Sequence, residues 1–143
     1  MEYREVISAP IWLIAFVYFI FLSIVLSIWA ALGDTPALVT FIVLTIALVV
    51  IYQKTKLVIE VDKEELRVGP ARIEKKYIGH CLNLDAPSFK LVRGRNADSA
   101  AYLGIRFWLP TGITMEVKDS RDSTPYWLIT SKRGQELTAL LNK

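Results

Sequence analysis

Two long apolar runs without charged residues dominate the first third of the chain. The first covers residues 11–32, and its 22 residues, at about 1.5 Å each, make a helix of about 33 Å. That length crosses a hydrocarbon core of about 30 Å. The second run covers residues 37–52, and the turn-forming residues 33–36 lie between the two. The pattern predicts a transmembrane helical hairpin over residues 11–52.

Two other interpretations of this region stay open. A signal peptide would begin with a basic segment and end at a small-residue cleavage site. Here the chain starts with acidic and basic residues mixed over positions 2–5, and a second apolar run follows at once. A helical hairpin buried in a soluble protein usually has shorter apolar runs. The length of the first run therefore favours the membrane.

The charges around the two runs predict their orientation. The connection between them contains Asp34 but no Lys or Arg, whereas Arg4, Lys54 and Lys56 flank the hairpin. Because positive charge stays on the cytoplasmic side, we expect a two-pass protein of the inner (plasma) membrane with both termini cytoplasmic. Residues 1–10 would be a cytoplasmic N-terminal segment. Neither run contains a charged residue, which argues against an ion or proton pathway through this hairpin alone.

Beyond the hairpin the apolar period changes to two. Apolar residues alternate with polar ones over residues 57–61, 101–109 and 113–117, and a further strand is predicted over 126–130. Leucines at helical spacing over residues 137–141 predict an amphipathic C-terminal helix.

These elements predict the fold class. Residues 53–143 are expected to form a small, mainly-β cytoplasmic domain of six or seven short antiparallel strands closed by a C-terminal α-helix. That arrangement fits a small barrel or a half-open sandwich. The complete chain is then a membrane α-helical hairpin (11–32 and 37–52) followed by this β-domain.

Composition excludes several classes of protein. With 143 residues, 53% hydrophobic and 22% charged, the chain is too apolar to be disordered. One Cys and one His can neither form a disulfide framework nor fill a metal shell. We therefore expect no metal and no cofactor.

Charge is distributed unevenly along the chain. Residues 1–52 have one basic and three acidic groups, whereas residues 53–143 have sixteen basic and eleven acidic groups, a net charge of +5. This balance fits a position beside anionic membrane lipids. We expect no nucleic-acid partner, because no recognition motif accompanies the basic residues.

One segment resembles a known family. The motif Asp-x-x-Asp-x-Thr-Pro-Tyr-Trp-Leu over residues 119–128, together with Arg106-Phe107-Trp108, resembles a family of small actinobacterial membrane proteins of unknown function. The resemblance covers essentially the whole chain, although residues 74–76, His80 and Gly134 depart from the pattern. The resemblance implies the architecture of the chain, but it implies no activity. The strand order with a terminal helix also resembles bacterial pleckstrin-homology-like (PH-like) domains on membrane hairpins, a likeness that implies the fold only.

Catalytic signals are weak. His80 and Cys81 are adjacent on a predicted strand, so their side chains point to opposite faces and cannot pair. Asp119 and Asp122 suggest paired carboxylates, but Asp is also common in turns, where it binds local backbone N–H groups. With Arg106, these two acids make up the enzymatic alternative.

Interaction signals are somewhat stronger. Lys132 and Arg133 fall in the first turn of the predicted terminal helix, where they and free N–H groups favour an anion such as a lipid phosphate or a partner carboxylate. The alternative is that both side chains are simply solvated. Arginine beside aromatic residues is typical of interfaces. The candidate interaction and anion-binding residues are Arg93, Arg95, Arg106, Trp108, Tyr126, Trp127, Lys132 and Arg133.

The sequence thus predicts a non-enzymatic integral membrane protein. It would present its PH-like domain at the inner face of the membrane, as an accessory, assembly or scaffold subunit of another membrane protein or a larger complex such as a respiratory one. One alternative is a module that binds anionic lipid headgroups. The other is a membrane-proximal enzyme that uses Asp119, Asp122 and Arg106. Expected partners are membrane lipids and another membrane protein, and a homo-oligomer stays open.

Overall fold

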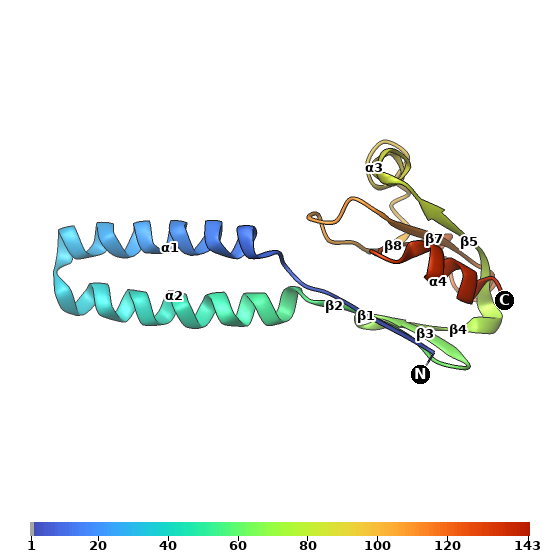
Figure 1. The fold of residues 1–143 in the computed structure, drawn as a ribbon, viewed down its shortest axis with the longest axis horizontal. Helices are drawn as coiled ribbons and strands as arrows, with labels where there is room; N and C mark the ends of the chain where they lie inside the picture. Colours follow the sequence, from blue (N-terminus) through green and yellow to red (C-terminus); the bar gives the residue numbers. More distant parts are fainter. Residues whose placement is uncertain (1) are drawn as a thin grey trace. The chain divides into compact units, whose positions relative to one another are not determined.

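The computed structural model describes residues 2–143, which divide into two compact units. The helical unit covers residues 8–56 (Figure 1). The β-sheet unit joins residues 2–7 to residues 57–143. The helical unit is therefore an insertion after the first strand of the β-sheet unit, and the two are described separately.

The helical unit is a hairpin of helices α1 (Ile11–Leu32) and α2 (Asp34–Thr55). Each has 22 residues and is long and apolar enough to cross a membrane. Gly33, with a φ of +91°, ends α1, and the indole N–H of Trp29 donates to Asp34 over 2.6 Å. Helix α2 starts three residues before the predicted apolar run, because an acidic residue in the first turn favours the start of a helix.

The first sheet of the β-sheet unit is fully antiparallel. Its strands, in spatial order, are β1 (Tyr3–Ile7), β2 (Leu57–Val61), β3 (Glu65–Val68) and β4 (Ala71–Glu74). Strand β1 pairs with β2 from Tyr3 opposite Val61 to Ile7 opposite Leu57. Residues 1–10 were expected to be only a segment ahead of the hairpin, but five of them form this edge strand.

The second sheet mixes pairing directions. Its strands, in spatial order, are β5 (Ile78–Leu84), β7 (Gly112–Val117), β8 (Tyr126–Thr130) and β6 (Tyr102–Gly104). Strand β6 is parallel to β8, whereas we expected antiparallel strands throughout. The 3-10 turn η1 (Lys75–Tyr77) connects the two sheets, and helix α3 (Ala86–Arg93) follows β5.

The predicted strand over residues 101–109 is mostly loop. It ends at Gly104, after which the backbone N–H of Arg106 donates to the Thr130 hydroxyl over 2.9 Å. This contact with a side chain turns the chain out of the sheet, so the alternation of residues beyond Gly104 does not extend the strand.

The inner faces of the two sheets share one apolar core. Alternate residues of β2 are buried, as the period of two predicts, and so are Ile113 and Met115 of β7. Helix α4 (Gly134–Leu141) packs Leu137 into the same core. The coarse prediction of a mainly-β region with a C-terminal helix is therefore confirmed, although residues 2–143 form eight strands in two sheets where six or seven were expected.

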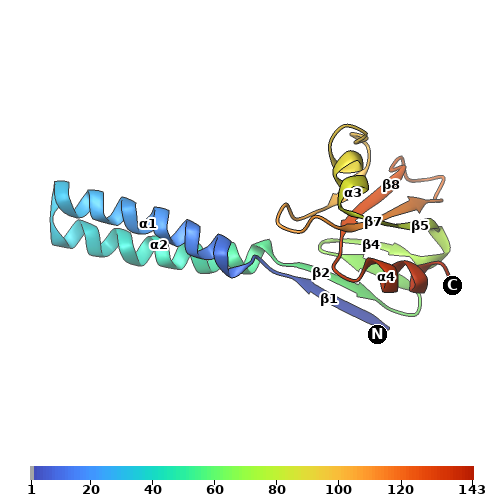
Figure 2. The same ribbon diagram turned by 45° about the horizontal axis from the view of Figure 1, so that its top comes forward.

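The two ends of the β-sheet unit differ in what they connect. Ile7 and Leu57 are paired, so the chain leaves the unit and returns to it at one end, which we name the exit end. Residues 105–111 lie at this end, where the carbonyl of Thr111 accepts from the N–H of Ser131. The turns at residues 62–65, 74–77 and 118–123 lie at the opposite, distal end (Figure 2).

Candidate functional site

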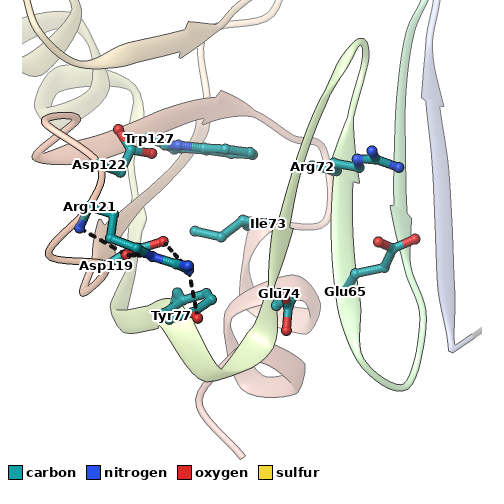
Figure 3. A pocket seen from close by; sticks show the side chains of 9 residues that line it. All are labelled: Glu65, Arg72, Ile73, Glu74, Tyr77, Asp119, Arg121, Asp122 and Trp127. Atoms are coloured by element: carbon teal, nitrogen blue, oxygen red, sulfur yellow. Dashed lines mark hydrogen bonds and ion pairs between the residues drawn. The ribbon is translucent and has the colours of Figure 1, made fainter.

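A cleft of about 360 Å³ opens at the distal end of the β-sheet unit. Figure 3 shows that its walls come from β3, β4 and η1 on one side and from the β7–β8 turn and β8 on the other. The residues that line it are Glu65, Arg72, Ile73, Glu74, Tyr77, Asp119, Arg121, Asp122 and Trp127. The cleft therefore combines residues from both sheets.

Two apolar side chains form the inner surface of the cleft. Ile73 of β4 points toward Trp127 of β8 (Figure 3). Trp127 is only 5% exposed, and its ring packs against that of Tyr102 with centroids 4.7 Å apart. This surface is rigid, because an aromatic ring held in the core has little rotamer freedom left.

Arg121 closes one side of the cleft through a fixed set of bonds. Its Nε and Nη2 donate to the Asp119 carboxylate over 3.1 and 3.2 Å, and its Nη2 also donates to the Tyr77 hydroxyl over 2.7 Å. The hydrogen bonds from the Arg121 side chain are the main reason why the pKa of Asp119 lies below its usual value. Asp119 is thus an ionised partner of Arg121 at neutral pH.

The remaining charges of the cleft are only partly paired. Glu65 and Glu74 lie directly opposite each other on neighbouring strands, an arrangement of like charges that is unfavourable by itself. Arg67 pairs with Glu65, and Lys76 pairs with Glu74 over 2.7 Å. Within residues 2–143, Arg72 and Asp122 form no ion pair.

Asp122 is therefore available to a ligand in the cleft. It accepts one hydrogen bond, from the backbone N–H of Thr124 over 2.9 Å, and is exposed. Arg72 is exposed as well, but its guanidinium points away from Ile73 and Trp127 (Figure 3). An acidic group beside an apolar surface suits a polypeptide segment with a basic side chain.

The structure separates the three residues of the enzymatic alternative. Asp119 and Asp122 both line the cleft, and each also binds a backbone N–H of its own turn, as the turn interpretation predicts. Arg106 lies at the exit end, where its N–H meets Thr130 and its Nη1 donates to the carbonyl of Ile105. The proposed catalytic trio is therefore not brought together.

The predicted anion site at Lys132 and Arg133 holds a carboxylate of the same chain. Glu5, which is 6% exposed, accepts from the N–H of Lys132 over 2.8 Å and from the Ser131 hydroxyl over 2.7 Å. It also accepts from the Tyr3 hydroxyl over 2.7 Å. Burial, and then this bond to Glu5, raise the pKa of Tyr3 to about 12, so the phenol stays a donor at neutral pH.

Arg133 strengthens the same attachment of β1. Its Nη2 donates to the carbonyl of Arg4 over 2.7 Å, and its guanidinium lies 4.5 Å from the centre of the Tyr3 ring. Of the predicted cation and N–H groups within residues 2–143, only the backbone N–H of Lys132 binds the carboxylate of residue 5. Sequence spacing gave no sign of it, because more than 120 residues separate the partners.

The other candidate residues are spread over the unit. Arg93 ends α3 and lies over the Phe89 ring, and Arg95 is exposed in the following loop. Trp108 is half-buried, and its indole N–H has no hydrogen-bond partner in the described chain. Tyr126 is half-buried and accepts from the N–H of Asp98. Of the eight candidates, only Trp127 lines the cleft.

Several residues of the cleft were not identified from the sequence. Arg121 lies between Asp119 and Asp122 in the motif over residues 119–128. A cation between two acids is a pattern from which this residue could have been identified. Arg72 and Tyr77 carried no signal, because nothing in the sequence places β4 and η1 beside the β7–β8 turn.

Cys81 and His80 lie in different environments. Cys81 is 2% exposed and faces the core, whereas His80 is exposed. Within residues 2–143, no group of His, Cys, Asp and Glu is arranged to hold a metal ion. Burial raises the pKa of the Cys81 thiol to about 11.

We expect the Cys81 thiol to react slowly in the folded protein. A pKa of about 11 in place of 9.0 lowers the thiolate fraction at pH 7 by about 100-fold, and the thiolate is the reactive form. The measurement is the rate of reaction with a chromogenic disulfide reagent, before and after unfolding in guanidinium chloride. A rate in the folded chain equal to that of the unfolded chain would show that Cys81 is open to solvent.

Comparison with known proteins gives one match. A family model described as "Protein of unknown function (DUF3093)" matches residues 2–141. No curated protein and no solved structure matches the chain. The predicted membership in a family of unknown function is confirmed over the whole chain, whereas its actinobacterial origin stays a prediction.

Proposed function

The chain belongs to the DUF3093 family of unknown function, and from this premise we propose that it is a non-enzymatic integral membrane protein that docks another membrane protein in its distal cleft. The hairpin would anchor it in the membrane, and the β-sheet unit would lie on the cytoplasmic side. Its role would then be that of an accessory, assembly or scaffold subunit.

Two observations support the membrane anchor. Helices α1 and α2 are uncharged over their apolar length and satisfy their backbone groups internally, as a lipid environment requires. The serine hydroxyls of α1 donate to carbonyls of the same helix, each over 2.9 Å. The basic residues Lys54 and Lys56 at the end of α2 favour a cytoplasmic β-sheet unit. A phosphatase reporter at the C-terminus that is active outside the cytoplasm would contradict this orientation.

We further propose that the β-sheet unit is a variant of the PH-like fold. Two four-stranded sheets around one core, with a C-terminal helix packed on β5 and β7, support this assignment. Two features depart from the expected layout. They are the parallel pairing of β6 with β8, and an edge strand that precedes the hairpin in sequence.

The cleft is the single observation that carries the docking function. It lies at the distal end, opposite the residues that connect to the hairpin, so it stays open to the cytoplasm in the proposed topology. Asp122 offers an unpaired charge beside the apolar side chains of Ile73 and Trp127 (Figure 3). Interfaces of this kind need an apolar centre and a polar rim, and the cleft supplies both.

Photo-crosslinking in native membranes tests this proposal. A photoreactive amino acid in place of Tyr77, which lines the cleft beside Arg121 (Figure 3), is expected to yield a covalent adduct with another membrane protein when placed in the full chain. Asp122→Asn should weaken the adduct by about tenfold, as expected for the loss of one charge-assisted hydrogen bond worth roughly 1.5 kcal/mol. Mass spectrometry of the adduct identifies the partner.

The matched control places the same photoreactive residue at Arg95, which is exposed but lies outside the cleft. Equal adducts from both positions would show non-specific contact and count against the cleft. Adducts that contain only further copies of this chain would replace the accessory function with self-association.

A further inference from the structure

The loop between β6 and β7 combines one exposed aromatic side chain, Phe107, with a lack of acidic residues. Phe107 is 68% exposed, unusually high for a large apolar residue, and its ring meets that of Trp108 edge-on with centroids 5.1 Å apart. In this region the backbone forms turns and no strand, and Pro110 lies two residues after Trp108. Within residues 2–143, no side chain covers most of the Phe107 ring, which is therefore accessible to an outside partner.

The position of this loop narrows the choice of partner. It lies at the exit end, where Ile7 pairs with Leu57. Strand β6 runs parallel to β8 toward that end, and Ser131, just after β8, bonds both Thr111 and Glu5. The loop and the two chain connections therefore share one end of the same unit (Figure 2).

The length of the chain keeps that end near the membrane. Four peptide steps separate Ile7 from the start of α1, and two separate the end of α2 from Leu57. At about 3.5 Å per step, Ile7 and Leu57 stay within about 14 and 7 Å of the helix ends in any arrangement of the two units. If the helices span a bilayer, the exit end lies at its surface.

The loops at the exit end and the turns at the distal end also differ in their charged residues. The exit-end loops, residue 85 after β5 and residues 69–70, 105–111 and 131–133, contain three basic residues and one acidic residue, Asp85. The distal turns, residues 62–65, 74–77 and 118–123, contain six acidic and five basic residues. Basic loops at one end suit an anionic lipid surface, and acidic turns at the other would be repelled by it.

We propose that the β6–β7 loop is a membrane-surface anchor, in which Phe107 enters the headgroup region of an anionic bilayer and Arg106 stays at the phosphate level. A large apolar side chain gains free energy when it leaves water for the boundary between headgroups and acyl chains. Trp108 packs against the core of the β-sheet unit and meets the Phe107 ring edge-on, so it supports the exposed ring from behind. This inference rests on the proposed membrane location.

Depth-dependent fluorescence quenching tests the proposal in the full chain. An environment-sensitive fluorophore is attached at Phe107→Cys, in a Cys81→Ala background, after reconstitution into vesicles that contain phosphatidylglycerol. Lipids with a spin label near the headgroup are expected to quench the fluorophore at position 107 several-fold more than the same fluorophore attached at Ser120→Cys. Ser120 is an exposed residue of the distal β7–β8 turn and serves as the matched control.

The same fluorophore attached at Leu22→Cys in α1 distinguishes the proposed loop anchor from the proposed membrane hairpin. Quenching at position 22 by lipids labelled deep in the acyl chain, with no quenching at 107, would overturn the loop anchor and leave the membrane hairpin standing. Absence of quenching at both positions would overturn both. A blue-shifted emission at 107 without lipid quenching would place a protein surface there, and it would also overturn the lipid anchor.

Discussion

Replacing Glu5 by glutamine is expected to lower the free energy of unfolding of the β-sheet unit by about 2–4 kcal/mol, because a buried carboxylate with several donors is lost. The two carboxylate oxygens accept from the Tyr3 hydroxyl, the Ser131 hydroxyl and the N–H of Lys132. A glutamine amide turns one of these oxygens into a donor, which then faces another donor. The measurement is denaturation of the full chain in mild detergent, followed by pulse proteolysis.

Glu60→Gln is the matched control. Glu60 lies on the neighbouring strand β2 and pairs with Arg4 over 3.4 Å, but its side chain is 27% exposed. Solvent-accessible pairs contribute little, so the expected loss is below about 1 kcal/mol. Equal losses for both variants would show that Glu5 is no more than a surface charge.

A double-mutant cycle between Glu5→Gln and Ser131→Ala then tests the contact itself. Residues that bond directly usually show a coupling of about 0.5–3 kcal/mol, whereas independent residues show nearly none. Additive effects would mean that the Ser131 hydroxyl contributes nothing to holding the Glu5 carboxylate.

Replacing Gly112 by alanine is expected to cost about 3 kcal/mol or more of folding stability. A Cβ at this position would overlap the carbonyl oxygen of Ile129 and the ring edge of Phe89, at separations below 3.0 Å. The Phe89 ring is fully buried and Ile129 belongs to the central strand β8, so neither can move without loss of packing or ladder bonds. The expected result is a chain that is mostly unfolded or degraded at 37 °C.

Gly94→Ala provides the comparison. The nearest atom to its new Cβ is the carbonyl oxygen of Lys90 at 3.2 Å, and the residue is exposed at the end of α3. Relief there needs only a small shift of a surface turn, so the expected cost is below about 1 kcal/mol. Thermal denaturation of both variants measures the difference, and a stable Gly112→Ala chain would show that β7 and β8 separate more easily than their pairing implies.

Local patterns were enough to place the helices and most strands. An uncharged run of 22 residues forms α1 almost regardless of context, since its side chains favour no other element of that length. In β2 and β7 the buried positions follow the alternation in the sequence, because successive side chains of a strand face opposite sides. This alternation depends only on neighbouring residues of one strand, so it can be recognised without knowing which strand pairs with it.

Strand β1 shows where local reasoning fails. Its inward-facing residues are Tyr3, Glu5 and Ile7, and an acid in the middle of that set hides the apolar alternation. Glu5 can be buried only because Ser131 and the N–H of Lys132 satisfy it. That compensation comes from the other end of the chain, so no window of sequence around residue 5 contains it.

The sequence alone determined that this chain has two helices fit for a membrane, a β-rich remainder and a terminal amphipathic helix, since each follows from the spacing of apolar side chains. Tertiary structure alone decided what the polar residues do. It joined Arg72 and Tyr77 to Arg121 in one cleft, moved Arg106 to the opposite end, and supplied Glu5 as the anion for residues 131–133. Ion pairs and hydrogen bonds form only between groups that lie within a few ångströms of each other. Partners that are distant in the sequence reach that separation only once the two sheets have packed.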